Sequence, residues 1–281
     1  MSVKRILLLL ALHAMALFLA ACGAAGSANT IGVEAIVPAE PAVQSGAVGP
    51  DLFALTEWDV VWISDNTGYY AAREYAKLIE DEFGVTVRLH DVVVRDLTAR
   101  QVLAALRGDS TVTQSRLKRL PELVRHAEVV VLSANPLESG APTASCSAYP
   151  YFVTNGSRQT WDQYRDELDR VYQMILGLRG DEPIAIRAYD AYSFGFFDWN
   201  RYGVKDTCSQ WWDMFNETLH ETSEEHGVPV AEVYAAFNGA DHSEDPRDKA
   251  LLGWDRINPN AAGARMIAEL VHDLGYEPTI E

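Results

Sequence analysis

The sequence predicts a three-layer α/β/α sandwich built around a five-stranded parallel sheet. Five short apolar runs rich in β-branched residues recur along the chain, and segments with helical spacing separate them. Continuous apolar runs are typical of strands that are buried on both faces. Strands that alternate with helices pair in parallel through right-handed crossovers, so the helices cover both faces of the sheet.

The predicted strands and helices follow in a regular order. The strands are Asp59–Ile63, Val85–Val94, Glu128–Leu132, Pro183–Ala188 and Pro229–Tyr234. The helices are Ala71–Phe83, a segment opened by a capping box of Thr98 and Gln101, Ser115–Ala127, a segment capped by Thr160 with Gln163, Ser209–His226 and Asn260–Leu274. Gly84 and Gly275 are expected to end the first and the last of these helices.

Composition and charge narrow the function classes. The 281 residues include 48% hydrophobic and 22% charged side chains, which excludes a disordered chain and favours one domain with a large core. The formal net charge is −17, so the chain is not expected to bind nucleic acid or to adsorb to anionic lipid headgroups by charge. Neither a Walker loop nor a dinucleotide fingerprint follows the first strand, and no cofactor is expected.

The N-terminus predicts export. Lys4 and Arg5 precede a short apolar stretch, as in a secretory signal, and residues 19–23 read Leu-Ala-Ala-Cys-Gly, which resembles the bacterial lipobox. We expect a signal peptide over residues 1–21, a lipidated Cys22 that anchors the chain outside the cytoplasm, and a flexible tether over residues 22–54. The folded domain is expected over residues 55–281. In the alternative, an ordinary signal peptide is cleaved, Cys22 is incidental, and the chain is still exported.

Two further cysteines remain in the exported domain. An extracytoplasmic compartment permits disulfides, and two isolated cysteines offer too few ligands for a metal site. The sequence therefore predicts a disulfide between Cys146 and Cys208.

Two short blocks follow predicted strands at the sheet edge where ligands bind in such folds, and a third precedes the last predicted helix. Ser64-Asp65-Asn66-Thr67 resembles a Gly-Asp-Ser block, Ser133-Ala134-Asn135-Pro136 resembles Gly-x-Asn-Asp, and Asp255-Arg256-Ile257-Asn258 resembles Asp-x-x-His. In this order, the blocks resemble those of the SGNH (GDSL-type) hydrolases. That resemblance implies a flavodoxin-like fold and ester hydrolysis.

Two of the catalytic positions depart from that family pattern. The resemblance places Asn66 at the nucleophilic serine and Asn258 at the histidine that serves as base, while Asp255 matches the aspartate that orients the histidine. A carboxamide supplies neither a nucleophilic hydroxyl nor a basic nitrogen at neutral pH. The family mechanism, transferred residue by residue, therefore fails.

The remaining positions of the cleft match the family more closely. Asn135 corresponds to the oxyanion-hole asparagine, and the resemblance gives Asp65 a structural role. The glycine that usually donates to the oxyanion from the second block is absent, since the turn there ends in Asp96. Asp65 and Asp96 are counted with Asn135 as candidate ligand contacts.

Other residues offer alternatives to the missing pair. Ser64 and His242 could form a displaced nucleophile and base. Asp65 and Asp255 could form an acid/base pair, but we prefer a structural role for Asp65. The acidic loop Asp241–Asp248 could bind a cation, but its carboxylates lack EF-hand spacing, and a solvated loop without metal is the preferred reading.

An aromatic segment after the fourth strand adds a further feature. It contains aromatic residues between Tyr189 and Tyr202, with Trp211 and Trp212 soon after. We prefer to interpret this segment as a satellite hydrophobic core, and not as a platform on which a sugar or an acyl chain stacks.

Two functions remain open at this stage. The first is a degenerate SGNH-like protein that binds a glycan or acylated ligand as a monomer. The second is an esterase for carbohydrate esters with rearranged catalytic residues.

Overall fold

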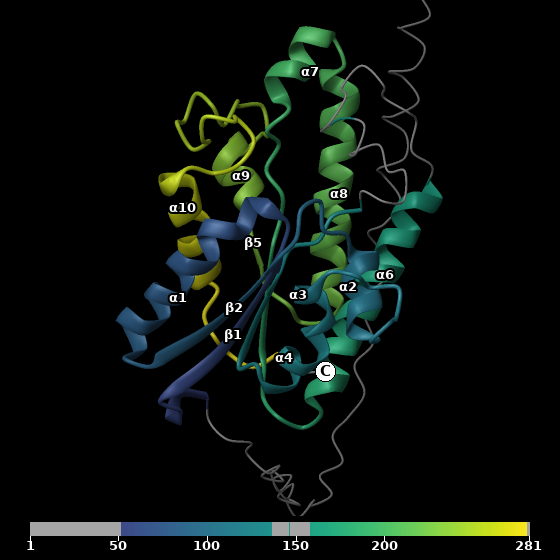
Figure 1. Ribbon diagram of the computed structural model, residues 1–281. Helices are drawn as coiled ribbons and strands as arrows, with labels where there is room; N and C mark the ends of the chain where they lie inside the picture. Colours follow the sequence, from purple (N-terminus) through teal and green to yellow (C-terminus); the bar gives the residue numbers. More distant parts are fainter. Residues whose placement is uncertain (1–51, 137–145, 147–157, 280–281) are drawn as a thin grey trace, which may run out of the picture. The chain divides into compact units, whose positions relative to one another are not determined.

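The computed structural model describes residues 52–136, 146 and 158–279, and within them five strands form one parallel sheet (Figure 1). The strand order is β2-β1-β3-β4-β5, and every neighbouring pair is parallel, as predicted. The strands are β1 (Glu57–Ser64), β2 (Thr86–Val93), β3 (Val129–Leu132), β4 (Ala185–Tyr189) and β5 (Val230–Ala231). This order is that of doubly wound flavodoxin-like folds, which place a ligand crevice at the carboxyl ends of β1 and β3.

Helices cover both faces of the sheet and bury two hydrophobic cores. On one face, α1 (Tyr69–Phe83) packs against α10 (Ala261–His272). On the other face lie α2 (Ala99–Leu106), α3 (Ser115–Lys118), α4 (Leu120–His126), α6 (Arg158–Arg179) and α8 (Lys205–Glu225). Side chains of β1 alternate between the two cores, because successive residues of a strand point to opposite faces. The predicted three-layer sandwich is confirmed.

The helix termini follow the predicted local signals. Gly84 takes a left-handed conformation at the end of α1, with φ of 66°, where a side chain would be strained. Thr98 accepts a hydrogen bond from the Gln101 N–H, and the Gln101 side chain accepts from the Thr98 N–H, so the capping box is formed. Asn260 caps α10 through the N–H groups of Ala262 and Gly263. Sequence signals therefore set these helix ends.

Some predicted boundaries were wrong. The single helix over Ser115–Ala127 is two helices, α3 and α4, because Pro121 cannot donate a helical hydrogen bond and fits only the first turn of a new helix. Helix α6 begins at Arg158, so Thr160 lies inside its first turn and is not its N-cap.

The last predicted strand was also too long. Strand β5 comprises only Val230–Ala231, because Val233 begins α9 (Val233–Asn238). The Tyr234 N–H donates to Asp190 Oδ1 (2.7 Å) and is unavailable to a strand. The sequence analysis missed α9, and it missed α7 (Phe196–Tyr202) within the aromatic segment.

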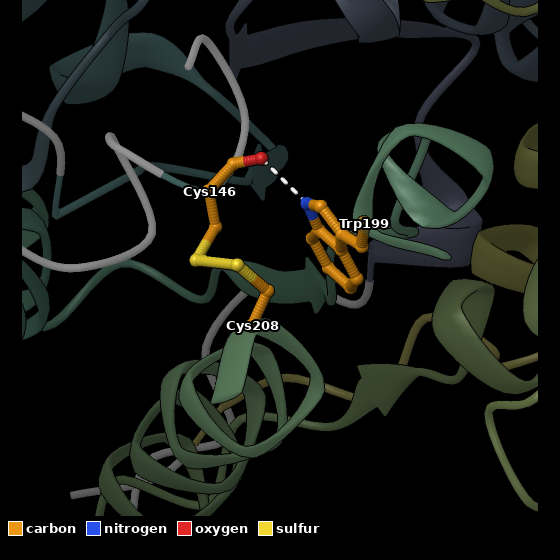
Figure 2. Close-up of a disulfide and its surroundings, with 3 residues drawn as sticks. All are labelled: Cys146, Trp199 and Cys208. Carbon is orange, nitrogen blue, oxygen red and sulfur yellow. Dashed lines mark hydrogen bonds between the residues drawn. A yellow bond between two sulfur atoms is a disulfide. The ribbon is translucent and has the colours of Figure 1, made fainter. Parts of the chain in front are cut away.

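The predicted disulfide between Cys146 and Cys208 is formed (Figure 2). Cys208 lies in the first turn of α8, and the backbone oxygen of Cys146 accepts a 2.6 Å hydrogen bond from Trp199 Nε1 on α7. Both sulfur-bearing residues and Trp199 are fully buried in one hydrophobic core. Trp199 is therefore a core residue, but it belongs to the main core on this face of the sheet and not to a satellite core. Other aromatic residues of this segment reach the candidate site.

The folded domain begins earlier than the predicted Leu55. Leu52 is buried in the core, and its carbonyl accepts a 3.1 Å hydrogen bond from Trp58 Nε1. The predicted signal peptide, the lipidated Cys22 and most of the tether lie outside the described residues. Within the described part of the chain, no helix is long and apolar enough to span a membrane.

Candidate active site

A cavity of about 90 Å³ lies at the carboxyl ends of β1, β3 and β4. It contains the predicted candidate residues Asp65, Asn66, Asp96 and Asn135, which three different strands bring together. The remaining lining residues are Thr67, Ser133, Tyr189, Asp190, Ala191, Tyr192, Phe194, Trp212, Phe215 and Ile257. The predicted edge of the sheet therefore carries a site that is lined by both polar and aromatic side chains.

A chain of hydrogen bonds runs through the positions of the absent triad. Asn66 Nδ2 donates to Asn258 Oδ1 (2.6 Å), and Asn258 Nδ2 donates to Asp255 Oδ2 (2.7 Å). An ionised carboxylate can only accept hydrogen bonds, so the amide nitrogen of Asn258 must face Asp255. The amide oxygen of Asn258 then faces Asn66 and accepts its hydrogen bond. The connectivity is that of nucleophile, base and orienting acid, with amides in the first two places.

Asp255 is held as an ionised acceptor. Its Oδ1 accepts 3.0 Å hydrogen bonds from the N–H groups of Ile257 and Asn258. Burial raises the pKa of Asp255, but these backbone bonds and the bond from the Asn258 side chain outweigh it, so the net shift is downward. Asp255 thus has a carboxamide to orient where the family has an imidazole.

Asp65 joins two strand ends and takes the structural role that the resemblance implied. Its carboxylate caps the short helix Asn66–Gly68 by accepting from the Thr67 N–H (2.9 Å), and it accepts from Asn135 Nδ2 (3.0 Å). Burial raises the pKa of Asp65, while the hydrogen bonds from Thr67 and Asn135 lower it. These contacts fix Asn66 at the end of β1 and Asn135 at the end of β3.

The turn after β2 carries a backbone feature that glycine normally supplies. Asp96 adopts a left-handed conformation with φ of 53°, and it lines the cavity at an exposed position. Asn135 is held beside this turn, since its N–H donates to the Leu97 carbonyl and its own carbonyl accepts from the Ala99 N–H. The turn therefore keeps a glycine-like shape although the family's glycine is absent.

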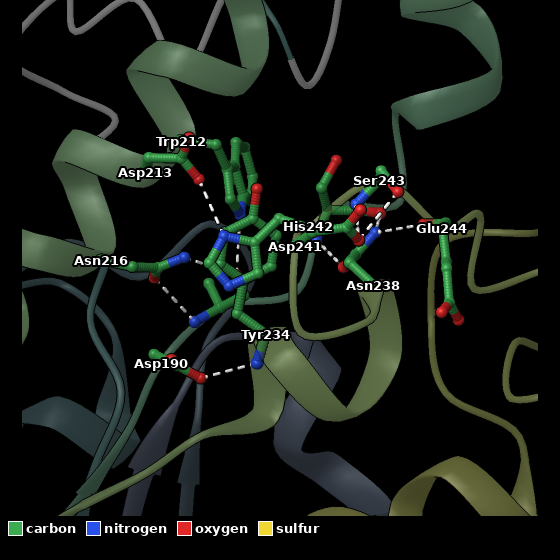
Figure 3. Close-up of polar contacts among 12 residues, drawn as sticks. Asp190, Trp212, Asp213, Asn216, Tyr234, Asn238, Asp241, His242, Ser243 and Glu244 are labelled. Carbon is green, nitrogen blue, oxygen red and sulfur yellow. Dashed lines mark hydrogen bonds and ion pairs between the residues drawn. The ribbon is translucent and has the colours of Figure 1, made fainter.

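Ser64 and His242 are not brought together. Ser64 is fully buried, where its Oγ accepts from Trp62 Nε1 (3.1 Å) and donates to the Asp65 carbonyl (2.9 Å). His242 pairs through Nδ1 with Asp213 Oδ1 (3.0 Å) and stacks on Tyr234 at 3.8 Å (Figure 3). No hydrogen bond between described residues joins the two side chains, so the structure gives the rearranged pair no support.

The acidic side chains of the loop after α9 form local hydrogen bonds and ion pairs. Asp241 accepts from Ser243, Asp245 forms an ion pair with Arg247 (2.7 Å), and Glu244 forms one with Lys249 (2.7 Å). Among the described residues, no group of three or more His, Cys, Asp or Glu side chains could hold a metal ion. The loop also makes a partly buried backbone contact, because the Glu244 carbonyl accepts from Asn238 Nδ2.

Two buried asparagines that the sequence analysis missed fasten the aromatic wall of the cavity (Figure 3). Asn216 on α8 accepts from the Ala191 N–H and donates to the Ala191 carbonyl, both at 3.0 Å. Asn238 accepts from the Ser193 N–H (2.8 Å) and donates to the Ser193 carbonyl (3.0 Å). These bonds satisfy the backbone of a strand-free segment that would otherwise be buried unpaired. Neither asparagine lies in a sequence motif that predicts such a backbone contact.

A histidine that the sequence analysis also missed supports the same wall. His220 Nε2 lies 3.0 Å from Asp190 Oδ2, and Asp190 is a buried residue of the cavity lining. The hydrogen bond from Asp190 raises the pKa of His220, against a smaller opposing effect of burial. His220 thereby brings a basic group from α8 to the Asp190 carboxylate.

The stability that His220 contributes is expected to depend on pH. Because its folded pKa is raised, the contribution is complete below the unfolded pKa of about 6.5 and is lost as the pH rises through the folded pKa. We expect His220→Ala to lower the melting temperature more at pH 5.5 than at pH 9. In an Asp190→Asn background this pH dependence should vanish. An equal loss at both pH values in the parent would contradict the ionic contact.

The comparisons with solved structures agree with the topology. A lipase from a goat rumen metagenome superposes with a TM-score of 0.56 at 16% identity, covering 78% of this chain and 98% of its own. A protein assigned as a GDSL-like lipase from Parabacteroides merdae gives 0.53 at 10% identity, with coverage of 77% and 94%. A catalytic mutant of the acetylxylan esterase Axe2 from Geobacillus stearothermophilus gives 0.50 at 16% identity, with coverage of 78% and 95%.

These neighbours share the fold described above. The chain has the SGNH hydrolase fold. No protein-family model and no curated protein sequence matches it. Sequence identities of 10–16% show a common fold alone. The roles of individual residues in this SGNH domain must therefore be inferred from its own geometry.

Proposed function

We propose that this SGNH-fold protein binds an acylated carbohydrate in its ester cleft and does not hydrolyse it by the mechanism of the fold family. The observation that carries the proposal is the 2.6 Å hydrogen bond between Asn66 Nδ2 and Asn258 Oδ1. In that place an active enzyme needs a hydroxyl that loses its proton to an imidazole. A carboxamide pair performs neither step.

The same amides suit binding. Among the described residues, no side chain or backbone group donates to Asn66 Oδ1, and Asn66 lines the cavity, so this oxygen can accept from a ligand hydroxyl. Asn135 uses one amide proton on Asp65 and retains a second one for a ligand carbonyl. Donors and acceptors side by side, with aromatic walls beside them, match an ester that is attached to a sugar.

The cavity is large enough for a short acyl group. Its volume of about 90 Å³ is several times the roughly 15 Å³ that one water molecule needs, so an acetyl group fits. The acetylxylan esterase among the structural neighbours is named for a substrate of this kind, which supports the choice of an acetylated carbohydrate.

Turnover of p-nitrophenyl acetate tests the proposal directly. We expect the purified chain to hydrolyse this ester no faster than its Asp255→Ala variant, because no nucleophile stands at the position of Asn66. Turnover in the parent that Asp255→Ala abolishes would show that the cleft performs ester chemistry without the family's serine and histidine. Thermal melting of both proteins in the same buffer provides the check that each is folded.

A further inference from the structure

Two aromatic side chains of the cavity lining are held in place by their own polar atoms. Trp212 Nε1 donates to the Ala191 carbonyl (2.7 Å), and the Tyr192 hydroxyl donates to the Ile257 carbonyl (2.6 Å). Both side chains line the cavity and are mostly buried. Because their donors are used within the protein, these side chains offer a ligand the π surface of rings that are already fixed.

Two phenylalanines extend this aromatic surface. The rings of Phe194 and Trp212 lie 6.4 Å apart at 81°, and the rings of Trp212 and Phe215 lie 5.9 Å apart at 90°. Both phenylalanines line the same cavity. We call Tyr192, Phe194, Trp212 and Phe215 the aromatic wall. Aromatic side chains that gather around one space are typical of sites that bind ammonium groups, because the faces of the rings attract a cation.

The charged side chains of the cavity lining are all acidic. They are Asp65, Asp96 and Asp190, and the described lining contains no lysine, arginine or histidine. Asp190 is paired with His220 from α8, and Asp65 accepts from Asn135. The Asp96 side chain forms no ion pair or hydrogen bond with any described residue. The cavity therefore offers one carboxylate that a ligand can pair with.

The carboxylates of the cavity oppose any further negative charge. Burial raises the pKa of Asp65, and the charge of Asp96 adds to this rise. Burial also raises the pKa of Tyr192, and the charge of Asp65 adds to that rise. A bound cation would offset this repulsion, whereas a bound anion would increase it.

A buried hydroxyl of the lining independently indicates a ligand. Tyr189 is 2% exposed and lines the cavity, and its hydroxyl forms no hydrogen bond with a described residue. Buried polar groups in proteins nearly always have a partner. A polar group on a bound ligand would supply one.

We infer that the cavity binds the ammonium group of a cationic organic ligand, with the aromatic wall around this group and Asp96 as its counter-charge. The inference goes beyond the proposed function, because it requires neither an acyl group nor a sugar. A quaternary ammonium group and a protonated primary amine share this chemistry. The ligands chosen for the test separate the two.

Calorimetric titration with ligands that differ in charge tests the inference. Choline is compared with 3,3-dimethylbutan-1-ol, in which carbon replaces the charged nitrogen, and glucosamine is compared with glucose. We expect at least one of the two cations to bind the full chain about tenfold more tightly than its neutral counterpart. Asp96→Asn should weaken the binding of that cation by about fivefold and leave the binding of the neutral compound unchanged.

The variants keep the shape of the cavity. Asparagine adopts a left-handed conformation readily, so Asp96→Asn preserves the turn with φ of 53°. Phe194→Leu keeps apolar volume but removes a ring, and it should weaken the cation more than its neutral counterpart. Asp162→Asn is the matched control, because Asp162 is an exposed aspartate of α6 outside the cavity lining. Thermal melting checks that each variant is folded.

The outcomes show whether the cavity recognises charge. Equal affinity for each cation and its neutral counterpart overturns the inference, and so does the absence of binding by both cations. A preference for charge that Asp96→Asn and Phe194→Leu both leave unchanged overturns it as well. A preference for choline alone assigns a quaternary ammonium ligand, and a preference for glucosamine alone assigns a primary amine. None of these results depends on turnover of p-nitrophenyl acetate, so the proposed function is tested separately.

Discussion

Asn66→Ser combined with Asn258→His is expected to create hydrolysis of p-nitrophenyl acetate, on the order of 10³-fold above the parent. The parts around these two positions are already arranged for the reaction. Asp255 Oδ2 lies 2.7 Å from the side chain of Asn258, so it can orient an imidazole at this position. Asn66 and Asn258 already meet at 2.6 Å, which is hydrogen-bond distance for a hydroxyl and its base.

The double change should act as a unit. Each single variant is expected to remain at the level of the parent, because a serine without a base or a histidine without a nucleophile leaves one step undone. Adding Asp255→Ala to the double variant should remove most of the gained rate, since the introduced imidazole would lose its orienting carboxylate. The rate should rise with pH as the imidazole loses its proton near its usual pKa of about 6.5.

One result would overturn this account of the cleft. A double variant that melts at the same temperature as the parent, yet hydrolyses no ester, would show that more than the two amides separates this site from an active triad. The turn at Asp96 would then be the next position to examine, because it occupies the place of a backbone oxyanion donor. Its left-handed φ of 53° makes Asp96→Gly a change that the backbone can accept.

Much of the fold was predictable because its signals are local. The β-branched runs of β1 and β3 are buried on both faces, as their composition predicts. The same prediction was wrong for β2, which lies at the edge of the sheet and is mostly only partly buried. Thr98, Gln101 and Gly84 set helix ends through contacts within a few residues. The point at which β5 ends was not predictable in this way. Strand β5 is short because the Tyr234 N–H donates a hydrogen bond to Asp190, which is distant in sequence.

In the candidate site, too, some residues were predictable from local sequence signals and others were not. The motif positions Asn66, Asn135 and Asn258 could be read from the sequence because each directly follows a strand or precedes a helix in a recognisable block. The residues that shape the cavity wall could not. Asn216, Asn238 and His220 act on backbone or carboxylate groups that are 25 to 45 residues away in sequence, and their helices have no pattern that marks them.

Replacing both disulfide cysteines, Cys146→Ser with Cys208→Ser, is expected to cause the largest loss of stability that we predict. The two residues are 62 positions apart, and they close a loop that includes α6, β4 and α7. In the chain-entropy model, opening a loop of this length costs about 4 kcal/mol of unfolding free energy. For a domain of this size, that corresponds to a fall of about 10 °C in melting temperature.

The loss should reach the cavity as well as the global melting temperature. Cys208 is one helical turn before Trp212, whose Nε1 donates to the Ala191 carbonyl (2.7 Å) in the aromatic wall. Dithiothreitol should lower the melting temperature of the parent to that of the double variant and leave the double variant unchanged, which separates the disulfide from the effect of the new hydroxyls. A double variant that melts within about 2 °C of the oxidised parent would mean that the buried contacts of Trp199 and α8 hold this loop without the covalent link.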